Sequence, residues 1–204
     1  GLFMLATDKY ILIPDDSIDV KNMGVKKIIA NAYDTPLTGL FFAGNSKCLI
    51  VPSNIDKDEI QNLKENLPKS VKLHLLNVKE NALGNLILTN DKVSFISPLL
   101  EQDKKEIETA LGTKTYVLNM EDRFLPAIFF VLTNKGFLCS NDIGEKDFKY
   151  VEEKSKLEGD YGSVNFGSIF IKAGLVANSN KYIAGGKTTG PEIARIDKCL
   201  SFLE

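Results

Sequence analysis

The chain is poor in the residue types on which much enzyme and metal chemistry depends. Its 204 residues include no tryptophan, one histidine and three cysteines. Cys48, Cys139 and Cys199 lie far apart, and their spacing fits neither a CxxC pair nor a set of metal ligands. Separated cysteines in apolar surroundings are typical of buried free thiols in a reducing compartment. We therefore expect a cytoplasmic protein with no metal and no cofactor.

A surplus of positive charge is also absent. Lysine and arginine together number 25, aspartate and glutamate 27, and the net charge is -2. General affinity for nucleic acid needs lysine and arginine to displace counterions from phosphates, so we expect no DNA partner, although a local basic face stays open. The longest apolar run, residues 127–132, is far too short to cross a bilayer, and we expect no membrane partner.

What remains is an ordinary globular composition. Hydrophobic residues make up 44% of the chain and charged residues 25%, which is enough apolar material for a sizeable core. The length suits one large domain or two small ones and does not decide between them.

A strand–turn–strand pattern gives the chain its organisation. The clearest copy has apolar residues at 86–88, a polar turn at 89–92 and apolar residues again at 93–96. Asparagine and aspartate suit such turns because they tolerate left-handed backbone and hydrogen-bond their own main chain. Four similar copies are expected, with first strands at 2–6, 39–43, 127–132 and 174–177 and second strands at 10–13, 48–51, 137–139 and 182–185.

The copies recur at a nearly constant interval. Taking Thr7, Asn45, Asn90, Asn134 and Ser179 as equivalent gives spacings of about 38, 45, 44 and 45 residues, within the range typical of repeat architectures. The sequence therefore predicts a single domain, 1–204, of five repeats at about 1–36, 37–81, 82–124, 125–166 and 167–204.

A segment with helical periodicity follows each hairpin. Helices are expected at 56–67, 101–111, 145–156 and 191–202, and the first repeat has the weakest one, because Gly24 interrupts residues 17–30. Asp56 with Glu59, and Thr189 with Glu192, have the spacing of a capping box. Further strands are expected at 71–76, at 115–118 and around 162–164.

One such unit cannot bury both its sheet and its helix alone, but five units around an axis can share a core. The repeat therefore predicts an α/β ring with pseudo-fivefold symmetry, and an open array of the same units is the alternative.

Several blocks of sequence resemble one known family. They are NALGNLILTNDK at 81–92, TNKG at 133–136, GSVNFGS at 162–168, AGLVANS at 173–179 and GGKTTGPE at 185–192, together with GNS at 44–46 and LIVP at 49–52. Over nearly its whole length the chain resembles the archaeal and eukaryotic translation initiation factor 6 family of ribosome anti-association factors. It lacks the polar C-terminal tail of the eukaryotic members, which favours the archaeal branch. The first repeat is short at its N-terminus, and Lys47 stands where a glycine is common.

The resemblance implies a pentein fold, a β/α propeller of five quasi-identical α/β subdomains around a pseudo-fivefold axis. It also implies a monomer that binds the large (50S) ribosomal subunit at its intersubunit face, blocks joining of the small subunit sterically and takes part in large-subunit maturation. The expected neighbours there are ribosomal proteins L14 and L24e and the sarcin–ricin loop of the rRNA. No catalytic residues are implied.

The polar turns are the candidate binding surface. Five similar turns on a ring would form a broad polar face, and its candidate ribosome-binding residues are Asn45, Lys47, Asn90, Lys92, Asn134 and Lys135. The alternative is that the asparagines serve only the backbone of the turns. On the first interpretation, Asn90→Lys is expected to leave the fold intact and to change binding.

Two further functions stay open. The pentein fold also includes guanidine-modifying enzymes, which need a cysteine nucleophile paired with histidine and carboxylates, but Cys199 and His74 lie in different repeats. We expect His74 on the solvent side of a strand. A ring that binds a small molecule in a central cavity is the other possibility. The glycine-rich run at 185–190 is no phosphate loop, because Lys181 stands where that motif needs a glycine.

Overall fold

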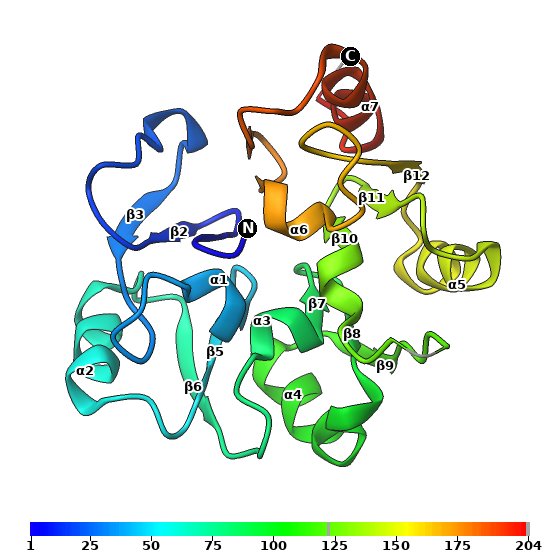
Figure 1. Cartoon of the computed structure of the whole chain (residues 1–204). Helices are drawn as coiled ribbons and strands as arrows, with labels where there is room; N and C mark the ends of the chain where they lie inside the picture. The colour runs from blue at the N-terminus through cyan, green and yellow to red at the C-terminus, as the bar shows by residue number, and fades with distance from the viewer. Residues whose placement is uncertain (122, 203–204) are drawn as a thin grey trace.

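A computed structural model describes residues 1–121 and 123–202 of the chain, a mixed α/β protein with five small sheets (Figure 1). Four sheets have three strands and the fifth has two among the described residues. The strands, sheet by sheet, are β1 (Leu5–Ala6), β2 (Tyr10–Ile13) and β3 (Lys26–Ile29); β4 (Ala43–Gly44), β5 (Cys48–Pro52) and β6 (Lys72–Leu76); β7 (Ile87–Thr89), β8 (Val93–Ile96) and β9 (Lys114–Val117); β10 (Phe130–Leu132), β11 (Phe137–Ser140) and β12 (Gly159–Gly162); and β13 (Leu175–Ala177) with β14 (Tyr182–Ala184).

Each three-stranded sheet has the same topology. The first two strands form an antiparallel hairpin, and the third runs parallel to the second, as in the sheet of β7, β8 and β9. A parallel partner needs a crossover connection, and helices supply it. These helices are α2 (Lys57–Asn66), α4 (Lys104–Leu111) after the 3-10 helix η2 (Pro98–Asp103), and α5 (Glu145–Ser155), while α7 (Gly190–Cys199) follows the last hairpin. The hairpins, the second strands and these four helices are therefore confirmed.

Helix boundaries follow from local capping chemistry. Both expected capping boxes are present, Asp56 with Glu59 at α2 and Thr189 with Glu192 at α7. The run at 185–190 is the turn that leads into α7, as expected. Each helix buries one apolar stripe, as Leu63 does on α2.

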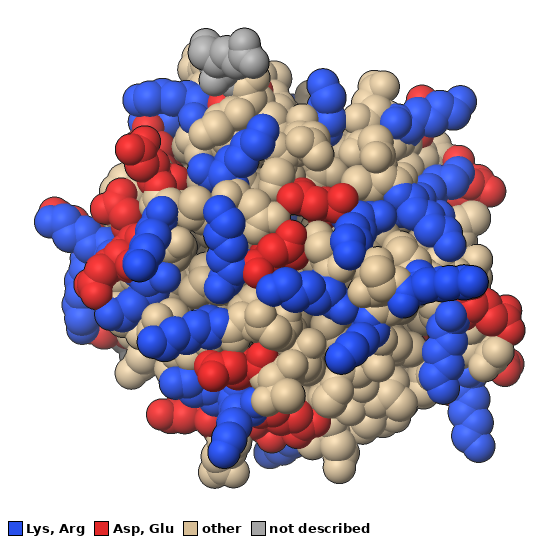
Figure 2. Space-filling view, turned by 180° about the vertical axis from the view of Figure 1, so that it is seen from behind, with Lys and Arg blue, Asp and Glu red and all other residues tan. Residues whose placement is uncertain are grey.

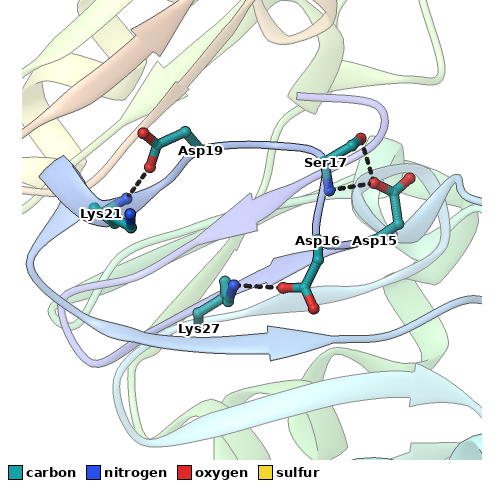
Figure 3. A network of polar contacts seen from close by, with 6 residues as sticks. All are labelled: Asp15, Asp16, Ser17, Asp19, Lys21 and Lys27. Atoms are coloured by element: carbon teal, nitrogen blue, oxygen red, sulfur yellow. Dashed lines mark hydrogen bonds and ion pairs between the residues drawn. The ribbon is translucent and has the colours of Figure 1, made fainter.

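The expected helix at 17–30 is wrong. Only the 3-10 helix η1 (Lys21–Met23) forms there, and Gly24 follows it with a left-handed φ of 66°. The chain then continues as β3, which pairs with β2. Figure 3 shows the polar contacts that hold this segment: the Asp15 carboxylate accepts hydrogen bonds from the backbone N–H and hydroxyl of Ser17, Asp19 accepts one from the Lys21 N–H, and Asp16 pairs with Lys27. The hydrogen bonds from Ser17 lower the pKa of Asp15.

The first strands of the hairpins are shorter than expected, because one short helical turn precedes each of the last four. These turns are α1 (Thr38–Phe41), α3 (Leu83–Leu86), η3 (Pro126–Phe129) and α6 (Ile171–Gly174). Neighbouring turns approach closely: a Cβ on Gly84 would lie 2.1 Å from the carbonyl oxygen of Gly39, and a Cβ on Gly39 would lie 1.9 Å from that of Gly1. In the first hairpin, β1 likewise covers only the end of the expected strand at 2–6. The apolar runs thus bend inward instead of continuing as strands.

The third strand of the fourth sheet begins earlier than the expected 162–164. β12 starts at Gly159, where a Cβ would lie 2.3 Å from the ring of Phe137, so a glycine is needed at this pairing.

The apolar cores lie between consecutive sheets. One cluster joins Phe95 of β8 with Phe130, Phe137 and Val151 of the following sheet and helix. Another joins Tyr10 and Leu12 to Phe42, Leu49 and Leu63. In Figure 1 the sheets follow one another around the molecule in chain order, with α1, α3 and α6 near its middle and α2, α5 and α7 toward its outside. In the described residues no helix has the length and apolarity needed to cross a membrane.

Candidate functional site

The turns of the five hairpins meet around one small polar cavity. It is lined by residues of all five, among them Asp8, Asn45, Asn90, Thr133 and Asn178. In each turn the N–H of the first residue donates to the carbonyl three residues later. The equivalent first positions are therefore Thr7, Asn45, Asn90, Thr133 and Asn178, so the alignment from the sequence was one residue late in the last two repeats.

The first residue of each turn also holds the turn itself. Asn90 Oδ1 accepts hydrogen bonds from the N–H groups of Lys92 and Val93 at 2.8 and 2.9 Å. Thr133 Oγ1 accepts the corresponding bonds from Lys135 and Gly136 at 3.1 and 3.2 Å. Asparagine and threonine are thus interchangeable here because each offers one oxygen to two backbone donors.

The second positions link consecutive turns. The backbone N–H of Ser46 donates to Asp91 Oδ1 at 2.7 Å, that of Asp91 to Asn134 Oδ1 at 2.9 Å, and that of Asn134 to Ser179 Oγ at 3.2 Å. The N–H of Ser179 then donates to Asp8 Oδ1 at 2.7 Å, which joins the last turn to the first. Between the first and second turns the corresponding acceptor, Ser46 Oγ, is buried without a partner among the described residues.

The asparagine amides make further bonds between units. Asn45 Nδ2 donates to the carbonyl oxygen of Asn90 at 3.1 Å, and Asn90 Nδ2 donates to that of Thr133 at 2.7 Å. Asn134 Nδ2 lies 2.8 Å from carboxylate oxygens of both Asp8 and Asp91. Asn45 is 2% exposed and Asn90 5%.

Of the two interpretations that the sequence left open for Asn45 and Asn90, burial favours the one in which they serve the turns. Their amides are consumed by bonds that hold the turns together, and Asn134 is half-buried in the same network. The expectation that Asn90→Lys leaves the fold intact is also incompatible with this geometry, because a lysine has no oxygen to accept hydrogen bonds from the N–H groups of Lys92 and Val93.

The lysines of the predicted site do face solvent. Lys47, Lys92 and Lys135 are exposed and occupy the same position of three turns. Lys9 occupies that position in the first turn and Lys181 lies one residue later in the fifth, and both were missed. The repeat alignment is the signal that could have found them.

Further exposed lysines lie beside these turns. Lys26, Lys72 and Lys114 begin the third strands of three sheets, and each pairs in register with the first residue of the second strand. They were also missed, because only the register brings them to this end of the sheets. We call this end of the molecule, with its five turns, the turn end.

The ammonium groups of Lys47 and Lys92 bond to carbonyl oxygens, which do not neutralise their charge. Lys47 Nζ donates to the carbonyl oxygens of Asp91 and Gly112 at 2.8 and 2.9 Å, and Lys92 Nζ to that of Asn134 at 3.2 Å. Within the described residues the lysine–carboxylate pairs involve other positions, which are Lys27, Lys149, Lys154 and Lys198. Figure 2 shows a face on which many Lys and Arg side chains surround a few Asp and Glu side chains near its middle.

The cysteines are buried free thiols, as expected. Burial raises the pKa of Cys48 to about 11 and that of Cys199 to about 12, and it raises the pKa of Cys139 further. His74 is half-buried and lies 2.8 Å from a carboxylate oxygen of Glu106, a partner that the sequence did not reveal. Among the described residues neither a thiol–imidazole pair nor a set of metal ligands is present.

A second cavity adjoins the first, since Ala6, Gly44, Thr89, Leu132 and Ala177 line both. It is lined mainly by apolar residues of all five sheets and by Lys172, and its volume of about 80 Å³ is well below the roughly 300 Å³ at which ligand pockets begin. Lys172 Nζ donates to the carbonyl oxygen of Gly84, and burial lowers the pKa of Lys172 to about 7.

Comparisons with known proteins agree with the sequence blocks. A family model for the eIF-6 family matches residues 1–199. A translation initiation factor 6 of Saccharolobus islandicus is 37% identical over 208 residues, which cover 98% of this chain and 93% of that protein. Proteins of the same name from Sulfolobus acidocaldarius and Staphylothermus marinus are 33% and 32% identical, each over 98% of this chain and over 93% and 92% of their own length.

Proposed function

The chain belongs to the eIF-6 family, and on that premise we propose that it is a translation initiation factor 6. In this role it binds the large (50S) ribosomal subunit at its intersubunit face, prevents association with the small subunit sterically and takes part in large-subunit maturation. The name shared by its relatives supports the role in translation. The exposed turn lysines are the observation that carries the binding surface.

The fold proposed with this function is a pentein, with five quasi-identical α/β subdomains around a pseudo-fivefold axis. Five sheets with a common hairpin, and four equivalent bonds between successive turns, support it. The five repeats would then form one domain with boundaries at about 1–36, 37–81, 82–124, 125–166 and 167–204. We further propose that the factor acts as a cytoplasmic monomer and catalyses no reaction.

The proposed contact is electrostatic. The net charge of -2 belongs to the whole chain, whereas the turn end carries lysines that lack carboxylate partners. Of the residues predicted from the sequence, Lys47, Lys92 and Lys135 would contact rRNA directly, in the neighbourhood of the sarcin–ricin loop. Asn45, Asn90 and Asn134 would act indirectly by holding the turns. Ribosomal proteins L14 and L24e are the proposed protein neighbours.

Salt dependence tests this assignment. Contacts between lysine and phosphate release counterions, so binding to purified large subunits should weaken steeply with salt. Replacing Lys47, Lys92 and Lys135 together by alanine is expected to weaken binding at low salt and to reduce the salt slope by about 2 to 3 units, close to one unit per lost phosphate contact.

A matched control removes the same charge elsewhere. Lys57, Lys64 and Lys105 are exposed lysines on or beside α2 and α4, and their triple alanine variant should keep the slope of the unchanged protein. Equal effects of the two triple variants would rule out the turn end as the binding surface. Subunit joining followed by light scattering tests the second part, because added protein should lower the yield of joined ribosomes.

A further inference from the structure

Two loops between repeats are built in the same unusual way. A bridge joins Ala32 to Thr35 in one, and a bridge joins Val164 to Ser168 in the other. The first has left-handed backbone at Tyr33 and Asp34, with φ of 54° and 55°. The second has three such residues in a row, Asn165, Phe166 and Gly167, with φ of 50°, 63° and 90°. Glycine, asparagine and aspartate tolerate left-handed backbone, so the strain falls on Tyr33 and Phe166, where the surroundings must impose it.

A glutamate imposes it in both loops. The Glu59 carboxylate accepts hydrogen bonds from the N–H groups of Tyr33 and Asp34, both at 3.1 Å. The Glu192 carboxylate accepts them from Phe166 and Gly167 at 3.2 and 2.9 Å. Each glutamate is also the capping-box residue of its helix, so one carboxylate holds the start of a helix and the loop of the preceding repeat together.

Glu192 is the more heavily bonded of the two. It also accepts hydrogen bonds from the Ser163 hydroxyl at 2.7 Å and from the N–H and hydroxyl of Thr189 at 2.7 and 2.9 Å. Burial acts to raise the pKa of Glu192, but the hydrogen bonds from Thr189, Ser163 and Gly167 outweigh it and lower the pKa to about 2. The carboxylate that accepts the hydrogen bonds of the loop therefore keeps its charge at any physiological pH.

The two loops differ in what they do with their aromatic residue. The Tyr33 ring packs edge-on against Phe41 with 4.9 Å between ring centres, and its hydroxyl contacts Asn54. Phe166 is 82% exposed. Four residues later Phe170 is 47% exposed, and its ring lies 5.9 Å from that of Phe129. Because the Phe166 ring lies in water, it buries little apolar area and adds nothing to the stability of the fold.

The chemistry of the loop selects the kind of partner. Residues 163–170 include no charged side chain, and the adjoining segment 185–189 contributes only Lys187. An RNA partner would need several lysine or arginine side chains to contact its phosphates. Exposed aromatic side chains that fill apolar pockets are, in contrast, typical anchors of protein interfaces. The loop also follows β12, which runs parallel to β11 and hence away from the turn end.

We propose that residues 163–170 form a second docking surface, in which Phe166 inserts into an apolar pocket of a protein component of the large ribosomal subunit. The inference rests on the proposed function. The Phe166 contact is independent of the turn lysines because it lies at the other end of the strands, so the two contacts engage different parts of the partner.

Binding of Phe166→Ala to purified large subunits tests the docking surface. The variant should bind at least tenfold more weakly, with the salt slope and the melting temperature of the unchanged protein. Phe166→Leu should recover part of the affinity, because leucine also fills apolar pockets. Leu99→Ala is the matched control, since Leu99 is 46% exposed in another repeat, and it should bind normally. Normal binding by Phe166→Ala would overturn the proposal.

A crosslink tests the class of partner. Phe166 replaced by p-benzoylphenylalanine should form, on irradiation in the complex with large subunits, an adduct with a ribosomal protein. An adduct with rRNA, or a reduced salt slope of Phe166→Ala, would overturn the protein pocket and indicate base stacking. If the unchanged protein fails to bind large subunits even at low salt, the proposed function itself falls and this inference with it.

Discussion

The turn end and the opposite end use polar groups in opposite ways. The opposite end carries the two loops held by Glu59 and Glu192, at 32–35 and 164–168, which we call the clamped loops. At the turn end, the side chains of Asn45, Asn90 and Asp91 form hydrogen bonds between repeats, and the turn lysines face solvent. At the other end, glutamate carboxylates are spent on backbone N–H groups, and phenyl rings are left for solvent. The side chains that take no part in these hydrogen bonds therefore set the character of each surface, which is charged at the turn end and apolar at the other.

The largest expected effect comes from breaking the turn end. Asn90→Leu keeps the volume of Asn90 but leaves the carbonyl of Thr133 and the N–H groups of Lys92 and Val93 without their partner. Because each unsatisfied buried group costs about 1–3 kcal/mol, we expect a loss of about 4 kcal/mol in the free energy of unfolding, measured by urea titration. Asn180→Ala, an exposed asparagine in the fifth turn, should change it by less than about 0.5 kcal/mol. Equal stability of the two variants would contradict the structural role of the turn network.

At the other end, Glu192→Gln should lower the free energy of unfolding by somewhat less than Asn90→Leu does. It should also change how the stability depends on pH. The pKa of Glu192 is about 2 in the folded protein, against an ordinary glutamate pKa of 4.5, so the unfolded chain takes up the proton first as the pH falls. Its stabilisation, about 3 kcal/mol, is therefore fully present above pH 4.5 and lost between pH 4.5 and 2.

The stability difference between the unchanged protein and Glu192→Gln should follow this course. It should be largest near pH 7 and should vanish toward pH 2, as measured by urea titration at each pH. A difference that stays constant with pH would mean that the carboxylate charge does not hold the loop.

The smallest changes in stability are expected from replacing the aromatic residue of each clamped loop, Tyr33 or Phe166. Tyr33→Ala removes a ring packed on Phe41 and should cost about 2 kcal/mol in the free energy of unfolding. Phe166→Ala removes a solvated ring and should change it by less than about 0.5 kcal/mol. Thermal unfolding of both variants measures the contrast, and a large loss of stability in Phe166→Ala would show that the ring serves the fold.

Much of the architecture was predictable from short-range patterns. The hairpin at 84–97, the helices with their capping boxes and the repeat itself rest on residues a few positions apart. The short helical turns in the middle of the molecule were not predictable in this way, because an apolar run such as 127–132 has the same pattern whether it bends or stays extended. Only in the folded protein do two of these turns approach the backbone of a neighbouring repeat closely, at Gly39 and Gly84.

The candidate site was predicted in part. The sequence indicated the turns as the surface, and Lys47, Lys92 and Lys135 are exposed there. It could not show that Asn45 and Asn90 are buried, because their partners lie about 45 residues along the chain in the next repeat. Phe166 gave no sequence signal of its own as a contact residue, since its exposure depends on the Glu192 carboxylate 26 residues away.

The sequence by itself therefore determined the repeat, the elements of each unit and the family, because these depend on periodicity, capping and turn chemistry within a few residues. The tertiary structure decided which polar groups are consumed and which are free. Bonds such as that from Ser179 to Asp8, 171 residues apart, form only when the repeats meet. Side chains left outside that network, the turn lysines and Phe166, are the ones available to a partner.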